Sequence, residues 1–463
     1  MQQIYITEPA RRTPALEADV FIAGAGTAGC IAAIAAARAG ASVVLVEKTP
    51  VPGGTYTNGG IGTYSYFSCN EDSTASKRIV GGIPYELAQR LTEAGGATGF
   101  MLSPQDHYRS GYRFVADHEA YKGVISQMLL EAGVTVLLQT MFCGVQMEGG
   151  RITAAIIENK DGRSAICAKQ YIDASGDGDI ARFAGLEQVE VWQDYDKVSG
   201  APTGLVFGMA GIDFDRFLAE NDDSAFAMPT MPAVDGRETR RISFTHKRRP
   251  DKYKPLEELD IRFFTSIQSL HDGEATYINN SKGAKIDATD AKAYSKAELE
   301  QRVKIMQMAQ AFKACVPGFE HSWLSWASVQ LGVRASRITL CDKILSSEEI
   351  SGAARFDDEI GLYGFHDFAP KHPELFVKAP GYYGFPYRML LAKGCENLFM
   401  AGRCVTTDIV AHMSTRNTVG CMVMGQGAGV AAALCARKGC GSRSLPYPEL
   451  RDSLLEQGVI LNV

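Results

Sequence analysis

Three glycines and one acid near the start of the chain have the types and the spacing that suit a dinucleotide. Gly24, Gly26 and Gly29 form a GxGxxG pattern after one apolar run, and Glu47 closes a second apolar run. The first glycine permits a tight turn, the second lets the backbone approach a pyrophosphate, and the third lets helix and strand pack closely. The acid is placed to accept hydrogen bonds from a ribose. The pattern predicts a dinucleotide site; the alternative is a glycine-rich loop in an ordinary α/β domain.

A strand, a helix and a second strand are needed to hold these residues in register. The apolar runs 20–23 and 43–46 predict the strands, and the alanine-rich segment between them predicts the helix. The N-terminus of such a helix presents unpaired N–H groups and a partial positive charge to phosphates. The order of these elements therefore predicts the first unit of a nucleotide-binding sheet.

A second glycine-rich segment follows the acid and narrows the choice of cofactor. It contains Gly53, Gly54 and Thr55. Extended backbone of this kind suits a long cofactor whose far end lies along the loop, which favours FAD over NAD. A second complete GxGxxG unit is missing from the sequence, so a separate NAD(P)H domain is not expected.

Later segments bring the chain back to the same sheet. Residues 151–159 and 164–169 predict paired strands, and YIDASGDGD (171–179) predicts a return strand that ends at the ligand edge. Near the C-terminus, a strand in NLFMAGRC (397–404) precedes a polar loop and a glycine-rich helix, 419–434. Glycines at 425, 427 and 429 indicate that this helix packs closely against something flat or another helix. The cofactor domain is therefore predicted to be discontinuous.

The middle of the chain has a different composition and predicts an inserted α+β substrate or cap domain. We expect the FAD-binding domain in 1–190 and 331–463, and the inserted domain in 191–330. The segment 296–314 predicts one long helix there, whose predicted buried stripe is Leu299, Val303, Met306, Ala309 and Phe312. The expected fold is α/β: a discontinuous Rossmann-like FAD-binding domain, with a parallel sheet and a β-meander, plus this insertion.

Composition excludes several classes of function. The net charge of −6, without a concentrated basic patch, argues against a nucleic-acid partner. The eleven cysteines include no CxxC pair, which argues against an iron–sulfur cluster, a zinc ribbon or a dithiol reductase, and no metal is expected. Residues 1–18 lack the apolar core of a secretory signal, and the most apolar segment is interrupted by Arg38 and Gly40. We therefore expect no membrane partner and a cytoplasmic location.

These motifs together resemble the FAD-dependent oxidoreductases of the fumarate reductase/succinate dehydrogenase flavoprotein superfamily, closest to its soluble bacterial subgroup. The resemblance covers nearly the whole chain and rests on ITEPARR, GAGTAG, VVLVEK, PGGT, GGIP-x-EL, YIDASGDGD, LGVRASR, PYR-x-LL, NLFMAGRC and GQGAGVAAAL. It implies a cofactor site made of Gly24, Gly26, Thr27, Ala28, Gly29, Glu47, Lys48, Gly53, Gly54, Thr55, Phe142, Ala174, Ser175, Gly176, Gly402, Arg403, Ser414, Asn417 and Thr418. Family members with covalent flavin attach it to a histidine near the first glycine loop. Residues 48–68 contain none, so non-covalent FAD is expected.

The resemblance implies a dehydrogenase or reductase that moves a hydride between flavin N5 and a small organic substrate, with an unidentified electron donor or acceptor. Candidates for the proton are His412 and Tyr382, or its neighbour Tyr383. Arg416 and Arg388 suit a carboxylate or enolate oxygen. The alternatives are that His412 is a structural loop residue, and that the arginines contact the flavin or serve the structure. A flavin monooxygenase or hydroxylase and a non-catalytic flavoprotein stay open as other functions, and a homo-oligomer is compatible with the sequence.

Overall fold

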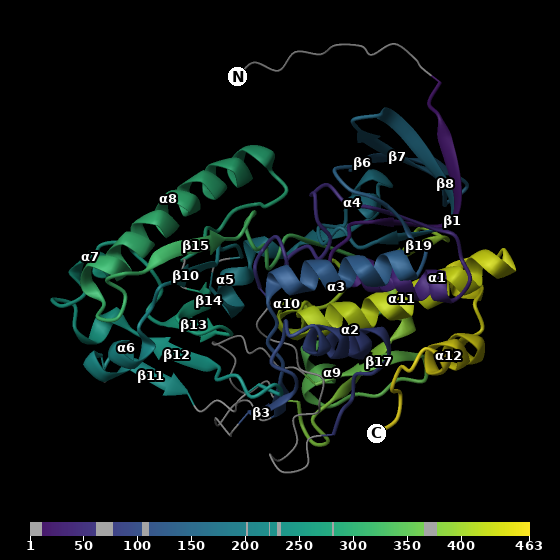
Figure 1. The fold of residues 1–463 in the computed structure, drawn as a ribbon. Helices are drawn as coiled ribbons and strands as arrows, with labels where there is room; N and C mark the ends of the chain where they lie inside the picture. Colours follow the sequence, from purple (N-terminus) through teal and green to yellow (C-terminus); the bar gives the residue numbers. More distant parts are fainter. Residues whose placement is uncertain are drawn as a thin grey trace.

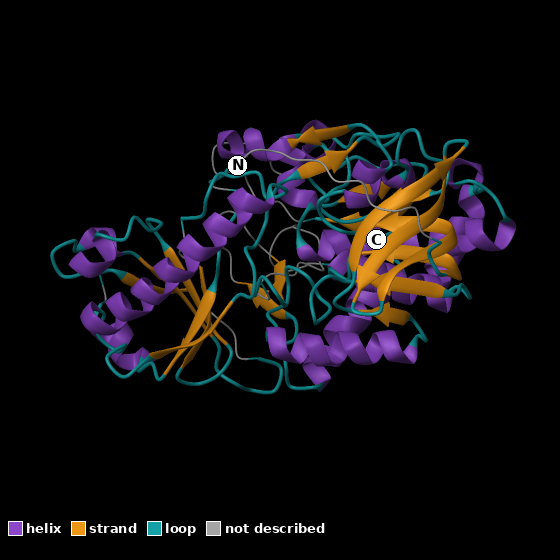
Figure 2. Ribbon diagram, turned by 90° about the horizontal axis from the view of Figure 1, so that it is seen from above, coloured by secondary structure: helices purple, strands orange, loops and turns teal. Residues whose placement is uncertain are grey.

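Two sheets lie at opposite ends of the molecule, with helices packed around them (Figures 1 and 2). The computed structural model describes residues 12–61, 77–103, 111–200, 202–221, 223–228, 233–279, 282–364 and 377–463. Of the predicted motif ITEPARR, only Arg12 falls within the described residues.

The first sheet is built from both ends of the chain. Its order is β5-β2-β1-β8-β7-β6, and β19 also pairs with β8. The parallel strands are β1 (Ala15–Ala23), β2 (Val43–Val46), β5 (Thr135–Leu137), β8 (Gly162–Asp173) and β19 (Leu398–Met400). β6 (Met141–Glu148) and β7 (Arg151–Asn159) complete an antiparallel meander with β8. Both expected features, the parallel sheet and the meander, are confirmed.

Helix α1 (Thr27–Arg38) packs against helix α11 (Thr418–Lys438), and glycines make this contact possible. A Cβ atom added at Gly425 would lie 2.2 Å from the carbonyl oxygen of Ala28. One added at Gly429 would lie equally close to the carbonyl oxygen of Ala32. The prediction of close packing is confirmed, and the surface it meets is another helix.

Helix α11 owes its apolar composition to this position. Among the described helices it alone is long and apolar enough to cross a bilayer, and its whole apolar window is buried inside the protein. Helices α2 (Gly82–Glu93), α3 (His118–Glu131) and α12 (Tyr447–Glu456) lie near it (Figure 1).

The second sheet is antiparallel and comes from the middle of the chain. Its order is β11-β12-β13-β14-β10-β15. The strands are β10 (Phe207–Ala210), β11 (Ala225–Met228), β12 (Arg240–Phe244), β13 (Thr265–Ser269), β14 (Glu274–Asn279) and β15 (Trp323–Ala327). It has its own apolar core, drawn from residues between 205 and 331, whereas the first core uses residues between 18 and 181 and between 341 and 461. These two cores agree with an inserted domain, whose boundaries at 190 and 330 stay a prediction.

The long helix of the second domain, α8 (Ala291–Cys315), buries a different face from the predicted one. Leu299, Val303 and Met306 are exposed by half or more, although Ala309 and Phe312 are buried as expected. The buried face also contains Ala297, Gln301, Ile305, Met308 and Ala311. The helix carries two stripes of apolar residues at helical spacing. The stripe that is buried in the second core is the one that includes Gln301.

The other described helices and strands are shorter. They are β3 (Met101–Ser103), β4 (Gly111–Arg113), α4 (Asp179–Phe183), β9 (Gln188–Glu190), α5 (Tyr195–Val198), α6 (Phe214–Glu220), α7 (Lys254–Glu257), β16 (Arg337–Thr339), α9 (Ser347–Ser351), β17 (Glu359–Tyr363), β18 (Tyr383–Pro386) and α10 (Ile409–Thr415). The pairing of β9 with β16 joins the chain just before the insertion to the chain just after it. This pairing therefore holds together the two points at which the chain enters and leaves the second domain.

Candidate functional site

The glycine turn between β1 and α1 has the geometry that its sequence predicts. Gly24 has a φ of +95°, and a Cβ atom there would lie 2.6 Å from the carbonyl oxygen of Ala174. A Cβ atom at Gly29 would lie 1.8 Å from the carbonyl oxygen of Gly24. A Cβ atom at Gly26, in contrast, would meet no described atom within 4 Å. The first and third glycines thus permit close packing, and the second leaves the backbone open to a ligand.

Glu47 fixes this turn with its carboxylate. Its Oε2 accepts a hydrogen bond from the N–H of Ala25 at 2.8 Å. Its Oε1 accepts hydrogen bonds from the N–H and the hydroxyl of Thr49, both at 2.9 Å. The side chain is buried but still lines the cavity described next. Because each carboxylate oxygen has two lone pairs, Glu47 can hold the turn and also accept a bond from a ribose.

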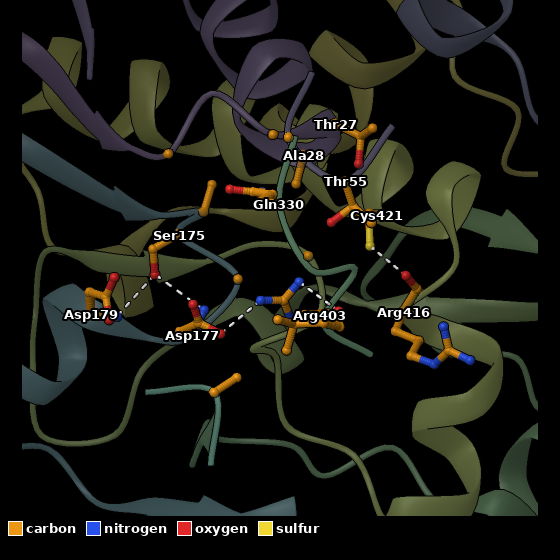
Figure 3. Close-up of a pocket in the computed structure, with 18 of the residues that line it drawn as sticks. Thr27, Ala28, Thr55, Ser175, Asp177, Asp179, Gln330, Arg403, Arg416 and Cys421 are labelled. Atoms are coloured by element: carbon orange, nitrogen blue, oxygen red, sulfur yellow. Dashed lines mark hydrogen bonds and ion pairs between the residues drawn. The ribbon is translucent and has the colours of Figure 1, made fainter. Parts of the chain in front are cut away.

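A cavity of about 470 Å³ opens beside this turn, a volume in the usual range for small-molecule and cofactor sites. Figure 3 shows Thr27, Ala28 and Thr55 on one side and Ser175, Asp177, Asp179 and Arg403 on another. Most of the predicted cofactor residues line it, namely Gly24, Gly26, Thr27, Ala28, Glu47, Lys48, Gly54, Thr55, Ala174, Ser175, Gly176, Gly402, Arg403, Asn417 and Thr418. Arg416, a predicted catalytic residue, lines it as well. The sequence motifs therefore converge in space, although they lie up to about 390 residues apart.

Four predicted cofactor residues lie outside the cavity lining. Gly29 and Gly53 support the turn from behind; the N–H of Gly53 donates to the carbonyl oxygen of Ala25 at 2.7 Å. The hydroxyl of Ser414 is hydrogen-bonded to Tyr383 at 2.7 Å. Phe142 packs against Phe21 and Phe183 instead, with ring centroids 6.2 and 5.5 Å away, while its neighbour Met141 lines the cavity. Successive side chains of a strand point to opposite faces, so a shift of one residue separates the prediction from the structure.

Two of the predicted catalytic residues also lie elsewhere. Arg388 forms an ion pair with Asp358 at 2.9 Å, and its side chain is 55% exposed. Tyr382 is buried beneath the guanidinium of Arg355, which lies 5.5 Å from the ring centroid. The structure brings neither side chain to the cavity lining. The proposal that these two groups hold or protonate a substrate has no support in this placement.

His412 is buried below the cavity rather than exposed in a polar loop. Asp408 caps the N-terminus of α10 by accepting from the N–H groups of Val410 and Ala411, so the segment predicted as a loop forms a short helix. Nε2 of His412 donates to the carbonyl oxygen of Arg403 at 2.9 Å, and Nδ1 has no partner in the described part of the chain. Burial and the nearby Arg416 lower the pKa of His412 to about 3. A neutral, buried ring of this kind holds the Arg403 backbone in place but is a poor proton donor near neutral pH.

Arg403 and Asp177 form the charged centre of the cavity wall. Arg403 donates to Asp177 at 2.7 Å and to the carbonyl oxygen of Val333 at 2.9 Å. Ser336 also donates to Asp177, at 2.6 Å. Burial alone would raise the pKa of Asp177, but Arg403 and Lys48 outweigh it and lower that pKa. Asp177 is thus an anion that keeps Arg403 pointed along the cavity.

Two parts of the cavity wall were not predicted from the sequence: the acid Asp179 and the residues that the inserted domain contributes. Burial and the neighbouring carboxylates raise the pKa of Asp179 to about 6. Arg337 donates to Asp179 at 3.0 Å. The remaining wall comes from the insertion and the chain just after it, namely Ala288, Thr289, Ala291, Tyr294, Gln330, Leu331, Val333, Arg334 and Arg337. Within this wall, Arg334 and Arg337 of LGVRASR agree with the sequence, which predicts that both point inward. The aspartates of YIDASGDGD were a visible signal for the second acid, whereas the start of α8 carried no signal.

The residues of the cavity fit an elongated, anionic cofactor. Helices α1 and α11 both begin at its wall, and within the described residues neither start carries a side-chain cap. Their first N–H groups are therefore open to phosphate or to a flavin pyrimidine. These two helix starts supply donors toward the cavity, as FAD requires.

Comparisons with known proteins agree with this site. A family model described as FAD dependent oxidoreductase matches residues 19–454. Digeranylgeranylglycerophospholipid reductase 2 of Methanopyrus kandleri is 28% identical over 37% of this chain and 41% of its own length. Digeranylgeranylglycerophospholipid reductase 1 of Methanococcoides burtonii is 24% identical over 43% of this chain and 46% of its own length. The chain thus matches less than half the length of these curated relatives.

A solved structure of a geranylgeranyl bacteriochlorophyll reductase-like protein from Thermoplasma acidophilum aligns over 96% of this chain and 83% of its own, with 14% identity and a TM-score of 0.44. The family match, in contrast, spans nearly the whole chain and includes every residue assigned to the cavity. The chain belongs to the FAD dependent oxidoreductase family, and its cofactor is FAD.

Proposed function

We propose that this protein holds FAD without a covalent bond and transfers a hydride between the flavin and a small organic substrate. The observation that carries the proposal is the single cavity that joins the glycine turn, the start of α11 and Arg416. Bound FAD supplies the hydride-accepting or hydride-donating centre. The relatives named above are called reductases, which supports this reaction class over hydroxylation. Membership of the fumarate reductase/succinate dehydrogenase superfamily is part of the proposal.

Each part of the cavity lining has its own role in this proposal. The turn at Gly24–Gly29 and the start of α1 hold the pyrophosphate, and Glu47 accepts from the ribose. Arg403, kept in place by Asp177 and His412, supports the middle of the cofactor. Arg416 lies beside the start of α11, where it orients the substrate or balances charge on the pyrimidine edge of the flavin.

The test combines acid extraction with anaerobic reduction. The purified protein is expected to be yellow, and trichloroacetic acid is expected to release its FAD into the supernatant. Colour that remains in the acid pellet would refute the non-covalent attachment. A colourless protein that fails to bind added FAD would refute the cofactor site itself.

Anaerobic substrate screening tests the reaction class. A substrate that donates a hydride bleaches the absorbance of oxidised flavin without oxygen, and one dehydrogenated product forms per flavin. A substrate that accepts a hydride restores the absorbance of flavin reduced beforehand with dithionite, and one hydrogenated product forms per flavin. A substrate that is consumed only when oxygen is present, with an oxygen atom added to the product, would show that the protein is a hydroxylase instead.

A further inference from the structure

Two cysteines lie at the two ends of the turn that terminates helix α11. The helix ends at Lys438, and Gly439 follows with a φ of +65°, in the left-handed region. The N–H of Cys440 donates to the carbonyl oxygen of Cys435 at 3.1 Å. This bond, from the residue after the left-handed glycine back to the last turn of the helix, is that of a Schellman motif. Such a motif brings the side chains at its two ends into contact, and here both are cysteines.

The sulfur atoms agree with this contact. The sulfur of Cys435 donates to the carbonyl oxygen of Gly441 at 3.8 Å, so it points toward the chain directly after Cys440. Burial, followed by the charge and the hydrogen bond of the neighbouring Cys440 thiol, raises the pKa of Cys435. A hydrogen bond between two side chains forms only at short range. The two thiols are therefore neighbours.

The turn that carries Cys440 is fastened to the first sheet. Nε2 of Gln170, on β8, donates to the carbonyl oxygen of Cys440 at 2.9 Å. Two residues later, the N–H of Ser442 donates to the carbonyl oxygen of Glu396 at 2.8 Å. The turn is thus held at two points, and the two cysteines keep their relative position.

A small dissolved molecule can reach this turn. A cavity of about 440 Å³ opens beside it, and Gly439, Gln170 and Arg151 belong to its lining. Cys440 is partly exposed, whereas Cys435 is buried. An oxidant from solution therefore meets the thiol of Cys440 first, and the thiol of Cys435 lies behind it.

We propose that Cys435 and Cys440 form a reversible disulfide, which makes this turn a site of redox modification by hydrogen peroxide. A disulfide requires Cα atoms about 4.4–6.8 Å apart. Only three covalent bonds separate the hydrogen-bonded N and O atoms from the two Cα atoms, so the N···O distance of 3.1 Å meets this requirement. The cross-link joins the last turn of α11, the helix that covers α1, to the loop after it.

The oxidation proceeds in two steps. The thiolate of Cys440 attacks one oxygen of hydrogen peroxide, the O–O bond breaks, and the thiol proton leaves with the other oxygen as water. The sulfur of Cys435 then attacks the sulfur of the resulting sulfenic acid, and its proton leaves with the second oxygen as water. Two thiols thus lose two electrons, and one peroxide becomes two molecules of water. A dithiol reductant reverses the reaction by exchange.

A second pair of neighbouring cysteines provides an internal comparison. Burial is the main cause that raises the pKa of Cys404, and Cys341 is among the neighbouring groups that add to it. Both of these cysteines are buried. A dissolved oxidant does not reach them in the folded protein, so they should keep free thiols under conditions that oxidise Cys440.

Peroxide treatment of the full-length protein with FAD bound tests the proposal. The remaining thiols are then blocked in denaturant, and the chain is digested with trypsin. Two of the eleven thiols should be lost. Trypsin cleaves after Arg437 and Lys438, so the two cysteines fall in separate peptides, 417–437 and 439–443. Mass spectrometry should find these peptides linked, and dithiothreitol should separate them.

The longer peptide also contains Cys421, which lies near the other end of the helix. At 1.5 Å per residue, it is about 21 Å from Cys435 along the helix axis. Cys421 therefore cannot reach Cys440 in the folded protein. Fragmentation of the linked peptides should assign the bond to Cys435 and leave Cys421 blocked as a free thiol.

Cys440→Ser and Cys435→Ala should each abolish the linked peptides. Cys167→Ser is the matched control, because Cys167 is also partly exposed but lies on β8. It should leave the linkage unchanged. FAD content and thermal stability show whether each variant is folded, and the digest of the unaltered protein needs no variant.

Several results would overturn the proposal. They are no loss of thiols, oxidation of Cys440 to a sulfinic acid while Cys435 stays free, or a link that forms only after unfolding. The same loss of two thiols in Cys435→Ala, or a link between Cys341 and Cys404 in place of this one, would also overturn it. None of these results bears on the hydride transfer proposed above.

Discussion

The guanidinium of Arg403 lies 2.7 Å from the carboxylate of Asp177, across 226 residues of sequence. Asp177 follows the central strand β8, and Arg403 follows β19, which pairs with the same strand. The ion pair thus closes the carboxyl edge of the sheet at the point where the N-terminal and C-terminal parts of the cofactor domain meet.

Asp177→Asn should destabilise the protein by about 3 kcal/mol, because it leaves the buried guanidinium of Arg403 without its anion. Both side chains are only 15% exposed, so water replaces the lost partner poorly. Chemical denaturation of the protein without FAD measures the change. The double variant Asp177→Asn/Arg403→Gln should cost less than the sum of the two single variants; strict additivity would contradict the ion pair.

Glu47→Gln should weaken FAD binding by about tenfold to a hundredfold, because an amide nitrogen then faces an N–H group that Glu47 now accepts from. The carboxylate also holds the glycine turn, so the melting temperature without FAD should fall too. Fluorescence titration with FAD gives the affinity. Glu93→Gln, at an exposed position at the end of α2, serves as the control and should alter neither quantity.

Arg416→Ala should raise the substrate concentration needed for half-maximal flavin reduction, or release FAD if the arginine balances charge on the flavin. Arg388→Ala is the matched control, since that arginine is paired with Asp358 away from the cavity lining. Anaerobic stopped-flow reduction and the flavin content give both readouts. Equal effects of the two substitutions would show that the cavity does not define the site.

His412→Gln should make stability less dependent on pH in acid. The pKa of His412 is lowered to about 3 in the folded protein, whereas an unfolded histidine takes up its proton near pH 6.5. Protons therefore bind preferentially to the unfolded chain, and stability is lost as the pH falls from 6.5 toward 3. Between pH 6.5 and 5 this amounts to about 2 kcal/mol. Denaturation curves at the two pH values measure it, and an unaltered slope in the glutamine variant would disprove the assignment.

Gly429→Ala should destabilise the protein by about 1–3 kcal/mol, because the added methyl group would push α11 away from α1. Gly123→Ala is the control on a helix surface. Its new methyl group would meet no described atom within 4 Å, so it should stabilise α3 by about 0.5–1 kcal/mol. Urea denaturation compares the two, and the opposite order would contradict the observed helix contact.

The parts of the site that the sequence predicts are those encoded within a few neighbouring residues. The roles of Gly24 and Gly29 follow from local backbone geometry, which the spacing of the glycines specifies. The final glycine-rich helix was predictable for the same reason, since Gly425 and Gly429 allow a close approach whatever their partner is. The identity of the partner, helix α1, required the structure.

The residues that were misplaced depend on contacts that the local sequence does not encode. Arg388 has the type of a substrate-binding residue, but a carboxylate 30 positions earlier holds it at the surface. The sequence predicts His412 in a polar loop, but Asp408 caps a short helix there, and this helix buries the ring. Phe142 was predicted to line the cavity, but its neighbour Met141 lines it instead. The face to which a strand residue points is fixed only when the strand pairs in its sheet.

The contact between α1 and α11 has a consequence for synthesis on the ribosome. Helix α1 emerges early, but the glycine-rich surface that covers it is made roughly 390 residues later. At about 5–20 residues per second, translation separates the two by on the order of 20–80 s. During that interval the apolar side of α1 lacks its final cover, so a nascent chain needs a chaperone or a temporary contact there, and FAD can join its finished cradle only after the last strand and helix arrive.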